Sequence, residues 1–512
     1  MKPSTILPVL VGVALTSLLV SPVWAQDEEE PEEVFYNFDA MNLDGNLGAT
    51  PGGAQDIAFF RDAVQREQVP LPQVFTAEGL FSEHDLPVAA SIPCHQLLCV
   101  TGTSMEARLL VQPEVRYLAQ LGFASGLSEK TFTRTPLHLV AVVDKSGSMG
   151  GRVDLVKQSL RAVVDQLGPD DQLTIVLYGD RSHVHLKPTR VTALLRGPIL
   201  TAIDAIAIAG STNMESGLAL GFEVARASSP QFSGQTRVML FTDERPNVGR
   251  TDASSFMSMA RAASNDGIGM TTIGVGVQFG AELATQISSV RGGNLFFFSD
   301  STRMTQVFQD EFDTMVTELA WDLNLLLKPI PGYRIAGVYG VPGDLLRWDK
   351  GGSIALSVET IFLSRRRGAI YIAVAPDSDH LPRAALVPGK PTVLVHLDYQ
   401  SVDRQRHQQA MGLDLVAANQ AGAGLQRGVM LVNQVTALKK ATTLHHHDND
   451  QDQAYRWVHA LAQLYRANTD PELDPERSLV FALEATLAKL AGYEGEHRPK
   501  TLDPISGLPT GP

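Results

Sequence analysis

The hydrophobic positions between residues 135 and 320 follow two alternating patterns. Short, nearly unbroken apolar runs are typical of strands buried on both faces of a parallel sheet. Between these runs, apolar residues recur every three or four positions, which predicts helices that cover the sheet. The runs predict strands at 137–143, 172–178, 238–242, 270–277 and 294–298, with a short edge strand at 182–187. The periodic segments predict helices at 152–167, 191–206, 214–227, 252–263, 281–290 and 302–319. The alternation predicts an α/β domain with a doubly wound, mostly parallel sheet.

The pattern changes after this domain. Residues 321–403 contain short apolar runs separated by Gly, Pro and Asp, which predict an accessory β-sandwich-like region. The runs lie at 323–327, 333–339, 353–358, 369–375 and 392–399. A helical region is predicted over 404–495, with helices at 404–442, 452–466 and 475–490, and a disordered tail over 496–512. Asp474 ahead of Pro475 is typical of a helix start.

The first 25 residues have the form of a secretory signal peptide. Lys2 precedes an apolar stretch at 6–20, and Val23-Trp24-Ala25 offers a cleavage site before Gln26. The stretch is short for a membrane span, and no second long apolar stretch follows. We therefore expect a secreted or periplasmic protein with no membrane span in the mature chain, with an uncleaved anchor as the alternative.

The segment after the signal peptide is acidic and then rich in glycine. This composition predicts a disordered linker over 26–55, followed by an N-terminal region over 56–134. Cys94 and Cys99 are the two cysteines of the chain, and they lie in that region. In an exported protein they favour a local disulfide, because a metal site would need two more soft ligands beside His95.

Chain length and net charge limit the number of domains and the classes of partner that we expect. A chain of 512 residues is too long for one hydrophobic core and divides into several domains. Its net charge of −14 argues against nucleic acid as a partner, because binding to phosphates needs clustered Lys and Arg. The basic run at 365–367 is interpreted as a solvated hairpin turn.

Three separated segments combine carboxylate and hydroxyl side chains next to predicted strands. The carboxyl ends of parallel strands share one edge of a sheet, where ligands collect, so we expect these segments to converge. An oxygen-only ligand set suits a hard cation such as Mg²⁺, with Mn²⁺ or Ca²⁺ as alternatives. The expected metal-site residues are Asp144, Ser146, Ser148, Thr212 and Asp243.

The segments Asp-Lys-Ser-Gly-Ser-Met from Asp144, Gly-Ser-Thr-Asn from Gly210 and Thr-Asp from Thr242 resemble the von Willebrand factor A (VWA) family. The resemblance covers residues 135–320 and implies an intact metal-ion-dependent adhesion site. It implies that the two serines and the threonine coordinate the cation, and that the two aspartates act largely through water. It also implies that an Asp or Glu of a protein partner completes the metal shell. The order of the segments resembles exported bacterial VWA proteins.

Other functions compete with metal-dependent binding. Ser146 lies on a strand-to-helix turn, as hydrolase nucleophiles do, but its flanking residues do not match the Gly-x-Ser-x-Gly elbow. A metal-activated hydrolase would need a general base, for which Glu215, Glu244 and Asp180 are the choices. A third possibility is an envelope assembly protein with a merely structural metal. Residues 445–452, which include three consecutive histidines, are interpreted as a solvated loop rather than a second metal site. We expect a binding protein and not an enzyme.

Overall fold

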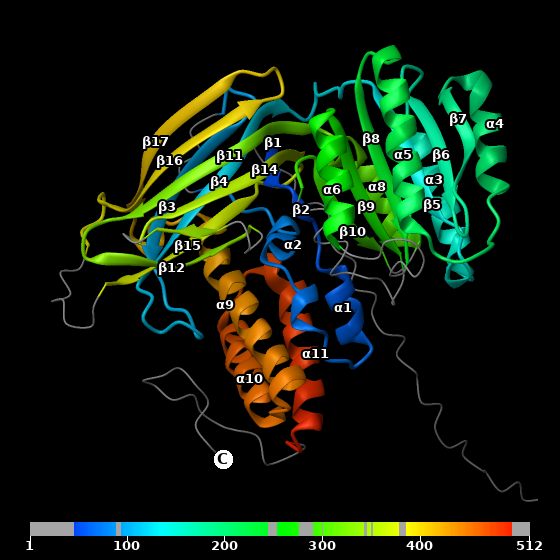
Figure 1. Cartoon of the computed structure of the whole chain (residues 1–512). Coiled ribbons are helices and arrows are strands. Elements are labelled where there is room, and N and C mark those ends of the chain that lie inside the picture. The colour runs from blue at the N-terminus through cyan, green and yellow to red at the C-terminus, as the bar shows by residue number, and fades with distance from the viewer. Residues whose placement is uncertain are drawn as a thin grey trace, which may run out of the picture. The chain divides into compact units, whose positions relative to one another are not determined.

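A computed structural model describes residues 46–88, 94–243, 253–275, 290–298, 301–341, 346–349, 352–377 and 386–493 (Figure 1). Four predicted segments lie wholly or largely outside these ranges. They are the signal peptide, residues 26–45 of the linker, nearly all of the helix expected at 281–290, and the tail.

The first sheet lies at the centre of the predicted α/β domain. Its strand order is β2-β10-β9-β8-β5-β6-β7, and the pairings are parallel except for β7, which is antiparallel to β6. Every residue of the central strand β5 is buried, as its unbroken apolar run predicted. The strands are β2 (Gly53–Ala54), β5 (Leu137–Asp144), β6 (Gln172–Tyr178), β7 (His183–Arg190), β8 (Gln235–Thr242), β9 (Ile268–Val275) and β10 (Gly293–Phe298).

Helices cover both faces of this sheet. Along β5, Leu139 and Ala141 pack in one core with α3 (Val153–Gln166), α4 (Ala193–Asp204) and α8 (Ser301–Met315). Val140 and Val142 face the other way and pack with α5 (Met214–Ser228) and α6 (Ala253–Asn265). The prediction of an α/β fold with a doubly wound sheet is therefore confirmed.

A second sheet contains strands that precede the α/β domain in the sequence and strands that follow it. Its path is β1-β14-β11-β16-β17-β3-β4-β15-β12, with β13 on β14, and β1 also pairs with β4. The strands are β1 (Asn46–Pro51), β3 (Cys99–Glu106), β4 (Tyr117–Ser128), β11 (Glu318–Pro329), β12 (Tyr333–Tyr339), β13 (Arg347–Trp348), β14 (Ile354–Ser364), β15 (Ala369–Pro376), β16 (Pro391–Ser401) and β17 (Arg406–Leu415). The regions predicted as separate at 56–134 and 321–403 thus contribute to one sheet, into which the α/β domain is inserted.

Two assignments made from the sequence are wrong. Residues 46–54, expected in a disordered linker, form β1 and β2, because each segment gains hydrogen-bonded neighbours that lie far away in sequence. The helix expected from residue 404 begins only at Ala423, and β17 precedes it as the antiparallel partner of β16. The first four residues of β17 are polar, so the hairpin partner rather than a local apolar pattern determines its structure.

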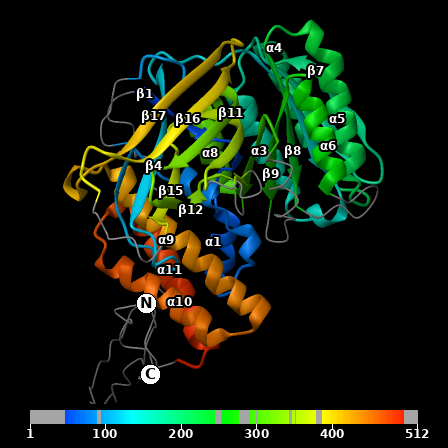
Figure 2. The same cartoon turned by 60° about the vertical axis from the view of Figure 1, so that its left-hand side comes forward.

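Helices pack on the outer face of β4 and β15. They are α1 (Ala58–Gln65), α2 (Ala77–Ser82), α9 (Ala423–Thr443), α10 (Gln451–Ala467) and α11 (Asp474–Leu490). Figures 1 and 2 show α9, α10 and α11 side by side below this sheet. The Tyr371 hydroxyl donates to the carbonyl oxygen of Gly424 at 2.5 Å. A Cβ at Gly428 would come within 2.1 Å of the Tyr371 ring, so glycine is needed for this close approach.

The basic run at 365–367 is not a solvated turn. It connects β14 to β15, and each arginine pairs with a carboxylate from a different segment. Arg366 pairs with Glu311 of α8 at 2.8 Å, and Arg367 pairs with Asp85 at 2.6 Å. Arg365 pairs with Glu129 after β4. Through these ion pairs, the run links the second sheet to α8 and to the segment that follows α2.

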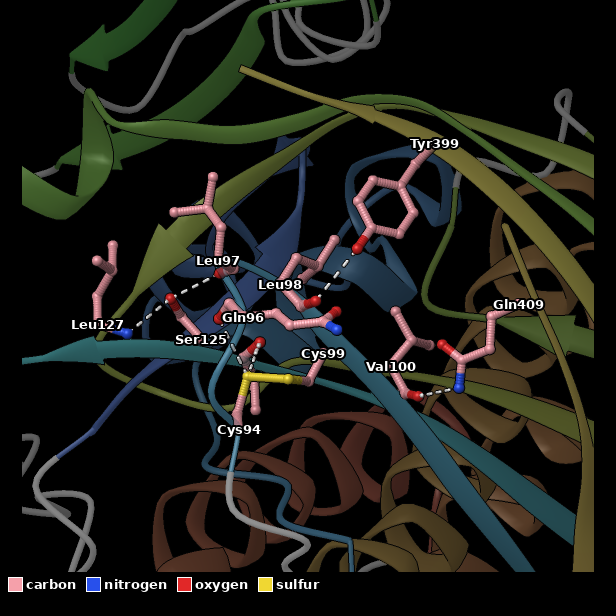
Figure 3. Close-up of a disulfide and its surroundings, with 11 residues drawn as sticks. Cys94, Gln96, Leu97, Leu98, Cys99, Val100, Ser125, Leu127, Tyr399 and Gln409 are labelled. Carbon is pink, nitrogen blue, oxygen red and sulfur yellow. Dashed lines mark hydrogen bonds between the residues drawn. A yellow bond between two sulfur atoms is a disulfide. The ribbon is translucent and has the colours of Figure 1, made fainter. Parts of the chain in front are cut away.

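The predicted disulfide between Cys94 and Cys99 is confirmed (Figure 3). It closes the turn that leads into β3, and neighbouring backbone groups of that turn bond to the second sheet. The Ser125 hydroxyl donates to the Leu97 carbonyl oxygen at 2.8 Å, and the Tyr399 hydroxyl donates to that of Leu98 at 3.2 Å. The disulfide and these hydrogen bonds thus hold the turn at the start of β3 against β4 and β16.

A buried ionic network joins the N-terminal helices to the C-terminal ones. The Glu476 carboxylate, fully buried on α11, accepts from Arg61 of α1, from His84 at 3.0 Å and from Gln434 of α9 at 2.6 Å. Burial would raise the pKa of Glu476, but the charge of Arg61 and the hydrogen bond to His84 outweigh it and hold the pKa at about 2.

Replacing Glu476 with Ala should destabilise the protein by about 3–5 kcal/mol at neutral pH, because Arg61 would lose a buried carboxylate partner. Since the pKa is depressed from 4.5 to about 2, the stabilisation by Glu476 is complete above the unfolded value and is lost as pH falls through the folded one. Urea unfolding at several pH values measures this. Glu472→Ala, at an exposed position just before α11, is the control, and equal stabilities of the two variants at neutral pH would contradict the expectation.

Candidate metal centre

The carboxyl edge of the first sheet brings three loops together. Asp144 is the last residue of β5, and Ser146 and Ser148 follow it in the turn before α3. Thr212 immediately precedes the α5 N-cap residue, and Asp243 follows β8. Strand β5 lies between β6 and β8, so the chain reverses its direction of progress across the sheet at this point. Such a switch point is where open α/β sheets bind their ligands.

Backbone hydrogen bonds hold these loops in place. The Lys145 N–H donates to the Tyr178 carbonyl oxygen at 2.9 Å, and the Ala209 N–H donates to that of Lys145 at 2.7 Å. The Gly147 N–H donates to the Gly210 carbonyl oxygen at 3.0 Å. Gly210 has φ of +91°, and a Cβ there would lie 2.8 Å from the Asp180 nitrogen. Only glycine fits this position without strain.

Four of the five expected residues form one hydrogen-bonded chain. Asp144 Oδ1 accepts from the Ser146 N–H at 2.8 Å, and the Ser146 and Ser148 hydroxyl oxygens lie 2.8 Å apart. The Ser148 hydroxyl donates to Asp243 Oδ1 at 3.1 Å. Thr212 is buried in the neighbouring loop. The structure thus brings four of the five predicted residues into contact and places Thr212 in the neighbouring loop.

The site holds two buried carboxylates close together. Burial raises the pKa of Asp144 to about 6, Asp243 adds to the rise, and hydrogen bonds from Ser146 oppose it. Carboxylate and hydroxyl oxygens are the donors that hard divalent cations prefer, and a cation among them would offset both the burial and the repulsion. This donor set therefore fits a divalent metal, which Asp144, Ser146, Ser148, Thr212 and Asp243 would hold.

Arg152 is a site residue that the sequence did not reveal. It lies just before α3 and forms an ion pair with Asp243 Oδ2. Its position shortly after the serines and next to the predicted helix start was the available signal. Lys145, which follows Asp144 in the sequence, and Arg181 both lie near Asp180. Hydrogen bonds from Ser211 lower the pKa of Asp180, and these two charges lower it further.

The described candidate bases, Asp180 and Glu215, have surroundings of their own. Asp180 accepts from the Ser211 N–H and hydroxyl, and its lowered pKa makes it a weak base. Glu215 lines a separate space of about 320 Å³ with Ser254 and Ser255, while Glu244 lies outside the described residues.

The histidine run does not form a second metal centre among the described residues. His445, His446 and His447 belong to a π-helical turn (Leu444–Asp448) that continues α9, so the predicted loop is wrong in its backbone. His446 Nε2 lies 2.9 Å from the Val69 carbonyl oxygen. No group of three or more His, Cys, Asp or Glu side chains in the described part of the chain is placed to hold a metal ion.

A mostly parallel sheet covered on both faces, with an oxygen-rich candidate site at its carboxyl edge, defines an α/β domain. Residues 138–310 match the von Willebrand factor type A domain family, and this part of the chain is a VWA domain.

Known relatives share this domain. The uncharacterized protein YfbK of Escherichia coli is 29% identical over 199 residues, which cover 38% of this chain and 34% of YfbK. Inter-alpha-trypsin inhibitor heavy chain H1 of Mesocricetus auratus is 26% identical over 211 residues, covering 40% of this chain and 23% of that protein. The chain thus spans well under half the length of these relatives. The solved structure of a von Willebrand factor type A protein from Catenulispora acidiphila is 13% identical, with a TM-score of 0.47, covering 82% of this chain and 94% of that one.

Replacing Gly210 with Ala should destabilise the protein by about 1–3 kcal/mol, because the new Cβ meets Asp180 and the backbone has positive φ. Gly197→Ala is the matched control, since Gly197 lies in α4 with no atom within 4 Å of a new Cβ. That change should stabilise the protein by about 0.5–1 kcal/mol. Urea unfolding of both variants measures the difference, and equal effects would refute the role assigned to Gly210.

Proposed function

We propose that this protein is an exported binding protein whose VWA domain captures a protein partner through a divalent cation, Mg²⁺ in the first instance and Mn²⁺ or Ca²⁺ as alternatives. The observation that carries the proposal is the hydrogen-bonded chain that runs from Asp144 through Ser146 and the half-buried Ser148 to Asp243. Mg²⁺ keeps an octahedral shell and several waters, so such a site leaves a position open for a ligand from outside.

The charges around the site support a partner that offers an Asp or Glu. Although the whole chain is acidic, Lys145, Arg152 and Arg181 lie at or near the metal site. A carboxylate approaching this rim gains favourable electrostatic interactions, and the cation then accepts it as a ligand. Like-charge repulsion from the rim disfavours basic partners.

Two features support export to a secreted or periplasmic location. The first 25 residues have the form of a signal peptide, and the Cys94–Cys99 disulfide belongs to an oxidising compartment. Among the described residues, no helix is long and apolar enough to span a membrane.

We propose binding rather than catalysis. Metal-assisted hydrolysis needs a base with a pKa matched to neutral pH, positioned within hydrogen-bond reach of the attacking water. Asp180 has a lowered pKa and already accepts two hydrogen bonds from Ser211. These contacts hold the Ser211 loop in place, which is a structural role.

Mg²⁺ should bind saturably to the full chain, and Ser146→Ala or Asp144→Ala should abolish this binding. Binding to the native state alone raises stability by about 2.7 kcal/mol at a hundred times Kd, so thermal unfolding with and without Mg²⁺ complements calorimetry. Asp154→Ala is the control, because Asp154 is an exposed carboxylate in the first turn of α3. Undiminished Mg²⁺ binding by both site variants would refute the assigned ligands.

Partner capture from the exported fraction should require both Mg²⁺ and the intact site. EDTA or Ser146→Ala should remove the captured protein, whereas Asp154→Ala should retain it, because only the first two changes empty the coordination site. Affinity capture followed by mass spectrometry provides the measurement. A partner that is captured equally well in EDTA would show that the interaction does not pass through the cation.

A further inference from the structure

A cavity of about 930 Å³ lies on the outer face of the second sheet, away from the VWA metal site. Strands β14, β11, β16 and β17 form its floor, and Figure 2 shows β11, β16 and β17 side by side. The side chains that point toward the interior from these strands, such as Leu325 and Leu397, belong to the core. The outward side chains are therefore not needed for core packing.

The strand register arranges the outward side chains in two neighbouring rows. In the first row, Ser357 pairs with Asn324, Asn324 with Asp398, and Asp398 with Gln408. At about 4.8 Å between strands, this polar row extends roughly 14 Å across the sheet. The second row is largely apolar and runs in the same direction through Ala355, Leu326, His396 and Ala410.

The polar row combines hydrogen-bond donors and acceptors with little net charge. The Asn324 amide donates to Asp398 Oδ1 at 3.3 Å, which orients both side chains along the row. Glu359 and Arg347 also line the cavity and contribute opposite charges. Burial raises the pKa of Glu359, which shows that this side of the cavity is partly shielded from water.

A solvated sheet face is commonly polar, so polarity alone indicates no ligand. Two further properties distinguish this face: it is hollowed into a large cavity, and its amide and carboxylate residues occupy paired positions on three neighbouring strands. A cation is a poor fit, because Arg347 places a positive charge beside the two carboxylates of the lining. An apolar ligand is a poor fit because of the first row.

We propose that this groove binds a neutral oligosaccharide chain. Sugar hydroxyls both donate and accept hydrogen bonds, which matches the amides and carboxylates of the first row. The C–H faces of sugar rings are apolar, which matches Leu326 and the two alanines of the second row. The groove is independent of the metal site, so the protein has two binding surfaces for different ligand classes.

The test is titration of the full chain with maltohexaose, cellohexaose and chitohexaose, followed by calorimetry. At least one should bind saturably, with affinity as weak as millimolar. Gln408→Ala and Asp398→Ala should each weaken that binding about tenfold, the loss expected when a hydrogen bond to the ligand is not made. Gln400→Ala is the matched control, because Gln400 lies on the same strand as Asp398 but outside the cavity lining.

Each variant should unfold at the same temperature as the unmodified protein, which shows that the variant folds. EDTA should leave saccharide binding unchanged, which separates this groove from the proposed metal-dependent function. Absence of saturable binding to all three hexasaccharides overturns the proposal. Binding that Gln400→Ala weakens as much as Gln408→Ala also overturns it, as does saturable binding of a neutral, extended hexapeptide in place of the saccharides.

Discussion

The candidate metal centre depends on two hydrogen bonds of the Lys145 backbone. Its N–H donates to the carbonyl oxygen of Tyr178 at the end of β6, and its own carbonyl oxygen accepts from Ala209. These two bonds fix the turn that carries Ser146 and Ser148 against the loop that carries Thr212. The oxygens of the site are therefore preorganised before a cation arrives, and the chain does not have to order three loops at the moment of binding.

Insertion of the VWA domain into the second sheet places that site on a rigid support. The Arg237 guanidinium of β8 pairs with Glu318 of β11 at 2.5 Å and donates to the Gly292 carbonyl oxygen at 2.9 Å. The Gly292 N–H in turn donates to the Thr360 hydroxyl of β14 at 2.6 Å. Asp56, which follows β2, links the start of α1 to β10 of the first sheet, because its carboxylate accepts from the N–H groups of Ala58 and Phe297. The two sheets are thus joined by buried polar contacts as well as by the chain itself.

The sequence predicted the features that local pattern determines. The apolar run of β5 and the periodic apolar positions of α3 predicted the α/β fold, and the motifs at Asp144 to Ser148 and at Asp243 predicted residues that lie together at the candidate metal site. It failed where a distant partner determines the structure. Strand β1 is extended because β14, far away in the sequence, lies beside it, and Arg152 joins the site because the fold carries Asp243 to it. Neither partner is visible within a window of neighbouring residues.

The chain enters and leaves the VWA domain at the end of β5 opposite the metal loops, and β2 is a further connection to the first sheet. Arg134, before β5, bonds to Asp313 near the end of α8 at 2.7 Å, so the entering and leaving segments lie side by side. The metal loops lie at the other end of β5, roughly 23 Å away at about 3.3 Å per residue. A force on the metal loops, where the proposed partner would bind, therefore runs lengthwise along β5 toward these segments. Under such shear the ladder hydrogen bonds to β6 and β8 must break together rather than in succession, which gives the domain mechanical strength in the direction in which a bound partner would load it.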